Sequence, residues 1–104
     1  MPAANVREEA RQSAALREGL ARVDAEFGLF AEMRGRGLML GAVLKPQHAG
    51  RAGEILDHAA AAGLLLLQAG PDVLRFVPPL SLTDADVVEG LARLRTALRA
   101  FVAA

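Results

Sequence analysis

The first quarter of the chain carries apolar side chains at the spacing of an amphipathic helix, over residues 5–27. Successive apolar positions are separated by four, three and four residues, as on one face of an α-helix. These positions are Leu16, Leu20, Val23 and Phe27. Gly28 follows directly and suits the left-handed conformation in which many helices end. Because its N-terminal turn is weakly capped, we interpret this long helix as a connector to a preceding domain.

The next apolar segment predicts two short strands, over residues 30–34 and 38–44. Between them, Gly35 and Gly37 lie close together, which suits a tight turn or a bulge. Residues 45–50 contain proline and glycine and are predicted to form a loop. This part of the chain is therefore expected to be a β-hairpin followed by a turn.

A second helix is predicted over residues 51–62, with Gly63 in position to end it. The side chains expected on its apolar side are those of Ile55, Leu56, Ala59 and Ala60.

The remaining segments predict two strands and a final helix. Residues 64–67 form a short apolar run between glycines, which favours a buried strand, and residues 73–77 form a strand that two prolines end. Thr83 and Asp86 have the spacing of a capping box. The helix that they begin continues at helical spacing through Val87, Leu91, Leu94, Leu98 and Phe101.

The order of predicted elements is helix, strand, strand, helix, strand, strand, helix. Such an order is typical of an α+β fold, in which helices pack on one face of a small, mainly antiparallel sheet of three or four strands. At 104 residues, the chain is expected to be a single domain spanning residues 1–104.

Composition excludes several classes of function. The 12 basic and 12 acidic residues give a net charge of zero, whereas nucleic acids and acidic membranes select a clustered basic excess. Cysteine is absent, which excludes disulfides, thiolate metal sites and a cysteine nucleophile. The polar, charged start of the chain is unlike a signal peptide. We therefore expect a cytoplasmic domain that binds neither nucleic acid nor membranes.

Two candidate sites carry weak signals. A metal site would need His48 and His58 to converge with Asp57 or Glu54, but the two histidines are predicted on different elements. The sequence favours two partly exposed histidines and no metal. The glycines at 35, 37 and 41 have the wrong spacing for a dinucleotide-binding loop and precede a strand, so they favour a hairpin over a phosphate site.

Arg75 is a stronger candidate because it interrupts an otherwise apolar strand. Strand alternation places it on one face with Val73 and Val77. On a mostly buried strand its charge must be paired, because an unpaired buried charge is strongly destabilising. One interpretation is an arginine that binds a planar carboxylate through two parallel hydrogen bonds. The other is an ion pair within the domain, with Asp72, Glu54 or Asp57.

Three sequence blocks resemble one known family. Residues 69–80, AGPDVLRFVPPL, are similar to the strand near the end of the class III (subgroup II) aminotransferases. Residues 32–41, EMRGRGLMLG, resemble the hairpin of that family, and residues 60–65, AAAGLL, resemble the segment before its next strand. The detail around residues 48–52 and 68–70 is most similar to the acetylornithine and succinylornithine aminotransferases.

The resemblance implies a fold-type-I enzyme in which pyridoxal phosphate (PLP) is bound covalently by a lysine of a large domain. It also implies that Arg75 binds the substrate carboxylate, that 2-oxoglutarate accepts the amino group in arginine metabolism, and that the whole enzyme is a homodimer. The family's cofactor lysine and phosphate-binding loop precede the region seen here, and Lys45, the only lysine, matches no cofactor motif. We therefore expect an inactive C-terminal domain that contains no catalytic residue and binds no cofactor or metal by itself.

An alternative is a free-standing α+β module that binds a ligand or regulates a partner and dimerises through its sheet. The two interpretations differ in their exposed surfaces. A domain separated from its partner would expose the strand end at Arg75 and a face of the first helix, whereas a free module would bury them.

Overall fold

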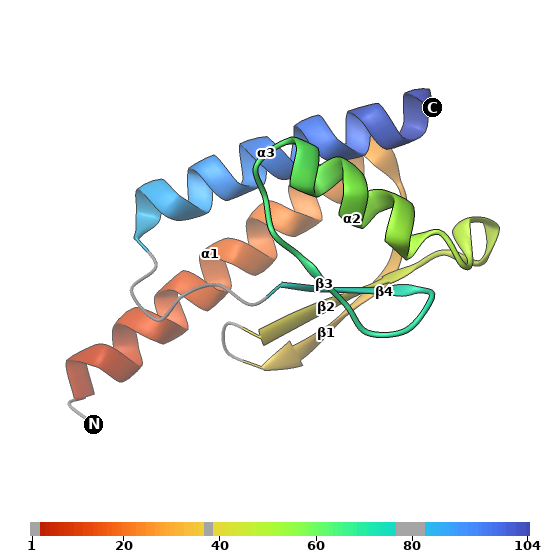
Figure 1. Ribbon diagram of the computed structural model, residues 1–104. Coiled ribbons are helices and arrows are strands. Elements are labelled where there is room, and N and C mark those ends of the chain that lie inside the picture. The colour runs from red at the N-terminus through yellow and green to blue at the C-terminus, as the bar shows by residue number, and fades with distance from the viewer. Residues whose placement is uncertain (1–2, 37–38, 77–82) are drawn as a thin grey trace.

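A computed structural model describes residues 3–36, 39–76 and 83–104 of the chain (Figure 1). The fold is α+β, with helices and strands in the predicted order. The elements are α1 Ala3–Phe27, β1 Phe30–Arg36, β2 Met39–Leu44, the 3-10 helix η1 Pro46–His48, α2 Ala52–Ala61, β3 Leu67–Gln68, β4 Val73–Phe76 and α3 Asp84–Ala103. Gly37, Leu38, Val77 and the proline pair, which the sequence places in turns or at strand ends, lie outside the described residues.

The four described strands form one sheet in the order β1-β2-β4-β3, and each neighbouring pair is antiparallel. The helices cover one face of this sheet (Figure 1). Alternation along the central strands decides which side chains meet the helices. The buried set on β2 and β4 comprises Leu40, Ala42, Leu44, Leu74 and Phe76. On the opposite face of the sheet lies none of the helices that the structure describes (Figure 1).

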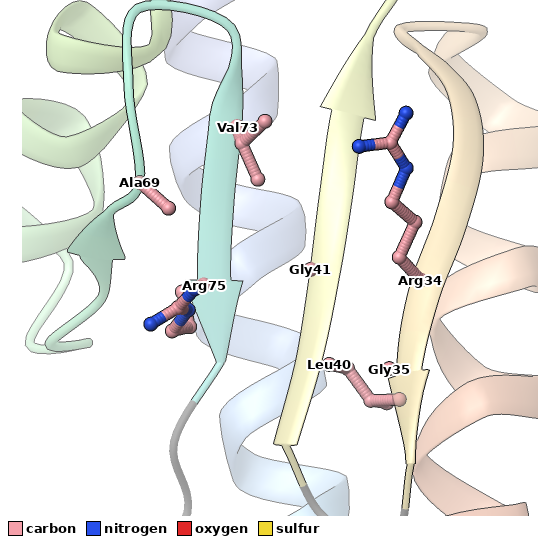
Figure 2. Close-up of a pocket in the computed structure, with 7 residues that line it drawn as sticks. All are labelled: Arg34, Gly35, Leu40, Gly41, Ala69, Val73 and Arg75. Atoms are coloured by element: carbon pink, nitrogen blue, oxygen red, sulfur yellow. The ribbon is translucent and has the colours of Figure 1, made fainter.

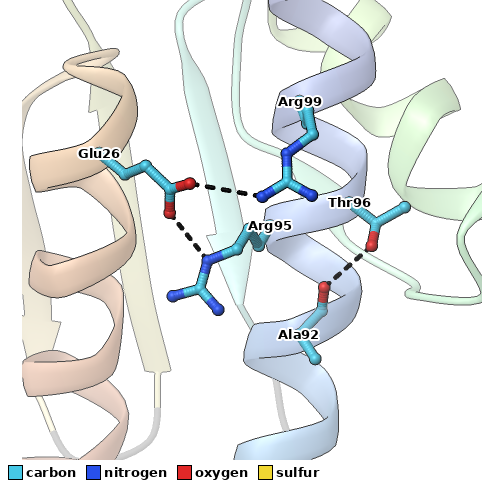
Figure 3. Close-up of polar contacts among 5 residues, drawn as sticks. All are labelled: Glu26, Ala92, Arg95, Thr96 and Arg99. Atoms are coloured by element: carbon cyan, nitrogen blue, oxygen red, sulfur yellow. Dashed lines mark hydrogen bonds and ion pairs between the residues drawn. The ribbon is translucent and has the colours of Figure 1, made fainter.

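The first and last helices pack against each other. Leu20 and Val23 of α1 are 1% exposed and join the same core as Leu94 and Leu98 of α3. These apolar positions of α1 are thus covered within the domain, as expected of a free module, whereas a separated domain was expected to expose a face of the first helix. On the surface, Glu26 accepts hydrogen bonds from Arg95 and Arg99 at 2.9 and 3.4 Å (Figure 3). Exposed pairs of this kind add little stability.

The join between α1 and β1 is fixed by hydrogen bonds. Gly28 has a φ of 65° and donates its N–H to the Asp24 carbonyl at 2.6 Å, as expected for a helix end. The Asp24 carboxylate then accepts from the N–H groups of Leu29 and Phe30 at 2.8 and 3.0 Å. These bonds satisfy the donors that follow the helix and direct the chain into the sheet.

Three local predictions are wrong. The strand predicted to end at residue 34 continues as β1 to Arg36, because Gly35 adopts a φ of 118° within it. Ala60 is exposed, since the buried row of α2 follows Ala52, Ile55 and Ala59. The run of leucines is mostly not a strand: β3 begins only at Leu67, and Leu65 and Leu67 are 88% and 57% exposed.

The capping box of the last helix is confirmed. The Thr83 hydroxyl accepts from the Asp86 N–H at 3.1 Å, and the Asp86 carboxylate accepts from the Thr83 N–H at 3.0 Å. Two donors at the start of α3 are thereby satisfied.

Gly63 follows the end of α2 in a left-handed backbone conformation that favours glycine. Its φ is +82°, and its carbonyl accepts a 2.9 Å hydrogen bond from Arg93 of α3. An added Cβ would lie 2.1 Å from the Arg93 Nη1 atom. We expect Gly63→Ala to lower the free energy of unfolding by about 1–2 kcal/mol, through backbone strain and displacement of Arg93.

Urea denaturation followed by circular dichroism measures this effect. Gly90→Ala is the matched control, because Gly90 lies within α3 and an added Cβ there would have no neighbour within 4 Å. The control should raise the midpoint, since alanine is the better helix former. Equal midpoints for the two variants would contradict the prediction.

Candidate functional site

An open pocket of about 450 Å³ lies on the sheet face that the helices leave free (Figure 2). In Figure 2 the helices lie behind the strands, so the pocket faces away from them. Residues of β1, β2 and β4 and of the loop before β4 line it. They are Arg34, Gly35, Leu40, Gly41, Ala69, Val73 and Arg75.

The centre of this pocket is a row of residues that pair across the sheet. Arg34 of β1 is opposite Gly41 of β2, and Gly41 is opposite Arg75 of β4. Leu67 of β3 is in turn opposite Arg75. Directly opposed residues project from the same face of a sheet. The backbones of two arginines therefore flank a position without a side chain, and in Figure 2 the Arg75 side chain extends toward the side of β4 on which Ala69 lies.

Arg75 has the orientation that alternation predicts but not the expected burial. Leu74 and Phe76, its neighbours on β4, are buried under the helices, whereas Arg75 is exposed on the open face. Its guanidinium can therefore be reached from solvent. It also remains hydrated, so it does not need the partner that a buried charge would require.

The interpretation that Arg75 forms an ion pair within the domain is wrong for the described residues. Asp72 accepts a 2.6 Å hydrogen bond from the Gly50 N–H, and it lies at the turn that precedes β4. Glu54 lies on α2 and pairs with Arg51 at 2.8 Å. Asp57 lies on α2 as well, and no carboxylate among the described residues forms an ion pair with Arg75.

Arg34 is a pocket residue that sequence reasoning did not single out. It forms an ion pair with Glu32, two positions earlier on β1 and on the same face of the strand. The alternation of charges at 32 and 34 was visible in the sequence. The register that brings Arg34 opposite Gly41 was not, because it depends on how the two strands pair.

The two histidines lie around the end of α3 instead of at the pocket. His48 and His58 are half-buried and stand edge-on to Phe101, with ring centroids 6.0 and 6.4 Å from its centroid. Arg51 lies over the same ring, 4.4 Å from its centroid. Within the part of the chain that the structure describes, no three His, Asp or Glu side chains are grouped as metal ligands would be.

The pKa values of Arg51 and Glu54, next to this cluster, are both shifted. Hydrogen bonds from Arg51 hold the pKa of the Glu54 carboxyl below its usual value, and the same bonds raise the pKa of Arg51. Both side chains are in contact with water, so the pair is expected to add little to stability. It lies on the helical side of the sheet and away from Arg75.

A model of the class III aminotransferases matches residues 3–98. The chain belongs to the class III aminotransferase family. Acetylornithine aminotransferase of Xanthomonas campestris pv. campestris is 74% identical to it over 94 residues, which are 90% of this chain and 23% of that protein. Succinylornithine transaminase of Yersinia enterocolitica is 51% identical over 77 residues, 74% of this chain and 19% of that protein.

Solved structures support the same assignment. The N-acetylornithine aminotransferase of Stenotrophomonas maltophilia K279a superposes with a TM-score of 0.94 and 63% identity, and the match covers 98% of this chain and 28% of that one. This class III aminotransferase chain thus spans about a quarter of the length of the relatives that it matches. The resemblance inferred from the three sequence blocks is confirmed.

Class III aminotransferases depend on PLP, which they bind through a lysine. Lys45 does not fit that role. It follows the last residue of β2, whereas the pocket lies around Gly41, and its N–H is bonded to the Leu29 carbonyl at the far end of the hairpin. Its ammonium group lies near Gly28, the residue that ends α1. Lys45 is the only lysine of this class III chain, and its position at the end of β2 does not fit the cofactor lysine of the family.

No helix among the described residues is long and apolar enough to cross a membrane. The longest of them, α1, is rich in charged residues along its 25-residue length.

Proposed function

We propose that this chain is the C-terminal domain of an acetylornithine aminotransferase, and that Arg75 binds the carboxylate of its substrates. The observation that carries the proposal is the placement of Arg75 on an open pocket without a carboxylate partner among the described residues. Its identity of 74% to the Xanthomonas enzyme supports the choice of substrate class. The succinylornithine transaminase of Yersinia enterocolitica is less similar, and it points to succinylornithine as the second candidate for the amino donor.

The role of Arg75 is geometric. A guanidinium presents parallel N–H groups that match the two oxygens of a carboxylate, so it fixes both the position and the plane of that group. In an amino acid held in this way, the α-amino group and the Cα–H bond are directed consistently toward the rest of the active site. Orientation of this kind lowers the entropic cost of reaching the transition state.

The remainder of the active site is assigned to the part of the enzyme that this chain does not include. There a large domain would bind PLP, which supplies the electron sink for amino transfer. We propose that α1 connects that domain to the sheet, and that residues 1–104 form one structural unit. The whole enzyme would act as a cytoplasmic homodimer in arginine metabolism, with 2-oxoglutarate as amino acceptor.

The exposed surface favours this proposal over a free-standing module. No helix among the described residues covers the sheet face that carries Arg75, and Leu67, opposite Arg75 on β3, is largely exposed. A module that folds and functions alone would be expected to cover such a face. The covered apolar face of α1 is a feature expected of the alternative, a ligand-binding or regulatory module. The family membership and the short span of the chain relative to its relatives outweigh it.

A chimeric enzyme tests the proposal. In the Xanthomonas campestris enzyme, the segment that matches this chain is replaced by residues 1–104, and transfer from acetylornithine to 2-oxoglutarate is measured. Because the two proteins are 74% identical over 94 residues of the exchanged segment, we expect the chimera to fold and to keep kcat within about tenfold of its parent. The isolated chain, assayed in parallel, should be inactive. A folded chimera that binds PLP but does not transaminate would contradict the proposal.

A further inference from the structure

Gly41 occupies the middle of β2, where glycine is normally unfavourable. Glycine inside a strand costs about 0.5–1 kcal/mol relative to alanine, because it loses more conformational freedom on folding. At two other positions the fold explains the glycine directly. Gly63 has a positive φ, and an added Cβ at Gly19 would lie 2.1 Å from the Leu91 side chain of α3.

Neither explanation applies to Gly41. Its φ is not positive, and an added Cβ would make only ordinary contacts, 3.5 Å from Val73 Cγ1 and 3.9 Å from the Leu74 carbonyl oxygen. The backbone and the packing of this domain would therefore accept alanine. The reason for glycine at this position must lie on the open face.

An added methyl group at Gly41 would project into the pocket. Gly41 pairs with Arg34 on one side and Arg75 on the other, so a side chain there would share their face. Its nearest neighbour would be Val73, which also lines the pocket. Since adjacent strands are about 4.8 Å apart, the backbones of the two arginines are separated by about 10 Å, with Gly41 between them. That gap is wide enough for the carbon chain of a small amino acid or 2-oxo acid.

We propose that Gly41 is a specificity-determining residue that forms the floor of the carboxylate pocket. Its missing side chain allows the substrate to lie across β2 while its carboxylate is bound by Arg75. Arg34, which is already paired with Glu32, borders the pocket on the β1 side and limits the length of substrate that can lie across β2. The inference rests on the proposed function of Arg75 and adds a steric requirement that the function alone does not imply.

The test separates stability, measured in the 104-residue chain, from substrate binding, measured in the chimeric enzyme that carries residues 1–104. Urea denaturation of the isolated chain gives stability, and the KM of the chimera for 2-oxoglutarate reports substrate binding. The variants are Gly41→Ala, Gly41→Val and Arg75→Gln, with Gly90→Ala as the control. Gly90 lies on α3, away from the pocket, with open space for a methyl group.

We expect Gly41→Ala to unfold at an equal or higher urea concentration than the wild type. Affinity for 2-oxoglutarate should fall about 3-fold in Gly41→Ala and about 10-fold or more in Gly41→Val. One carbon more or less in a closed apolar pocket changes binding about 10- to 200-fold, and this open pocket leaves the substrate more room to adjust. Gly90→Ala should bind as the wild type does. Two results would overturn the inference: unchanged affinity in both Gly41 variants, or a clear loss of stability in Gly41→Ala, which would show that the fold itself needs glycine.

The design distinguishes this inference from the proposed function. If Arg75→Gln weakens binding but the Gly41 variants do not, the inference fails and the role of Arg75 stands. If Arg75→Gln leaves the KM of the chimera for 2-oxoglutarate unchanged, both fail.

Discussion

Replacing Arg75 by alanine in the chimeric enzyme is expected to lower kcat/KM about 10- to 150-fold, for the amino donor and for the 2-oxo acid alike. This range corresponds to the loss of a charge-assisted hydrogen-bonded pair, about 1.5–3 kcal/mol. Both substrates should be affected because each presents a carboxylate next to the reacting carbon. Most of the loss should appear in KM, with a smaller decrease in kcat from poorer orientation.

Three further variants show whether the loss of kcat/KM is due to the parallel N–H donors of the Arg75 guanidinium. Arg75→Lys keeps the charge but loses the parallel donors, so it should recover only part of the affinity. Arg34→Ala should cost less than Arg75→Ala, because the Arg34 guanidinium is already engaged by Glu32. Arg22→Ala, on the exposed side of α1, removes an arginine from a pair with Glu18 and serves as the distant control.

Stability provides an independent check on the same variant. Arg75 is exposed and forms no ion pair among the described residues, so Arg75→Ala should leave the urea midpoint of the isolated chain nearly unchanged. A variant that loses activity only because it unfolds would therefore be recognised. Unchanged kcat/KM for both substrates in a folded Arg75→Ala chimera would rule out the assigned role.

The sequence predicted the elements well where their signals are local. The helical spacing in α1 and α3, the capping box at Thr83 and the glycines that end two helices all act within a few residues. Alternation in β4 likewise predicted which face Arg75 would share with Val73. These features depend on the residue itself and its near neighbours, so a single sequence is sufficient to identify them.

The run of leucines shows where local reasoning fails. Four identical side chains contain no alternation, so the sequence could not indicate which of them would point inward. In the structure Leu66 is buried while Leu65 and Leu67 are exposed, and only Leu67 belongs to the edge strand β3. The number of apolar residues alone suggested burial of the whole run.

The pocket itself could not be derived from the chain alone. It joins the β1–β2 hairpin to β4, which is distant from it in sequence, and only the register of these strands brings Arg34, Gly41 and Arg75 into one row. The expectation that Arg75 would be buried and paired failed for a related reason. Sequence alternation separates the two faces of a strand, but it does not indicate that the helices leave one of those faces uncovered.

The largest effect on stability is expected at Phe101, near the end of α3. Phe101 is 2% exposed and belongs to the core that joins α3 to the sheet. Its ring also contacts the segment around η1 and α2, through Arg51 and the edges of both histidines. Phe101→Ala should therefore destabilise the domain by about 3–5 kcal/mol, the usual cost of removing a buried aromatic ring.

That loss is a large fraction of the 5–15 kcal/mol, roughly, that holds a domain of this size folded. Urea denaturation of the isolated chain would measure it, with Val102→Ala as the control, because Val102 is the next residue along α3 and is 51% exposed. The control should change the free energy of unfolding by less than about 0.5–1 kcal/mol. Phe101→Leu, which keeps apolar volume but loses the ring contacts with Arg51 and the histidines, should fall between the two. If Phe101→Ala and Val102→Ala unfolded at the same urea concentration, α3 would not be docked through Phe101 in solution. The support that α3 gives the sheet behind Arg75 would then have to come from elsewhere in the core.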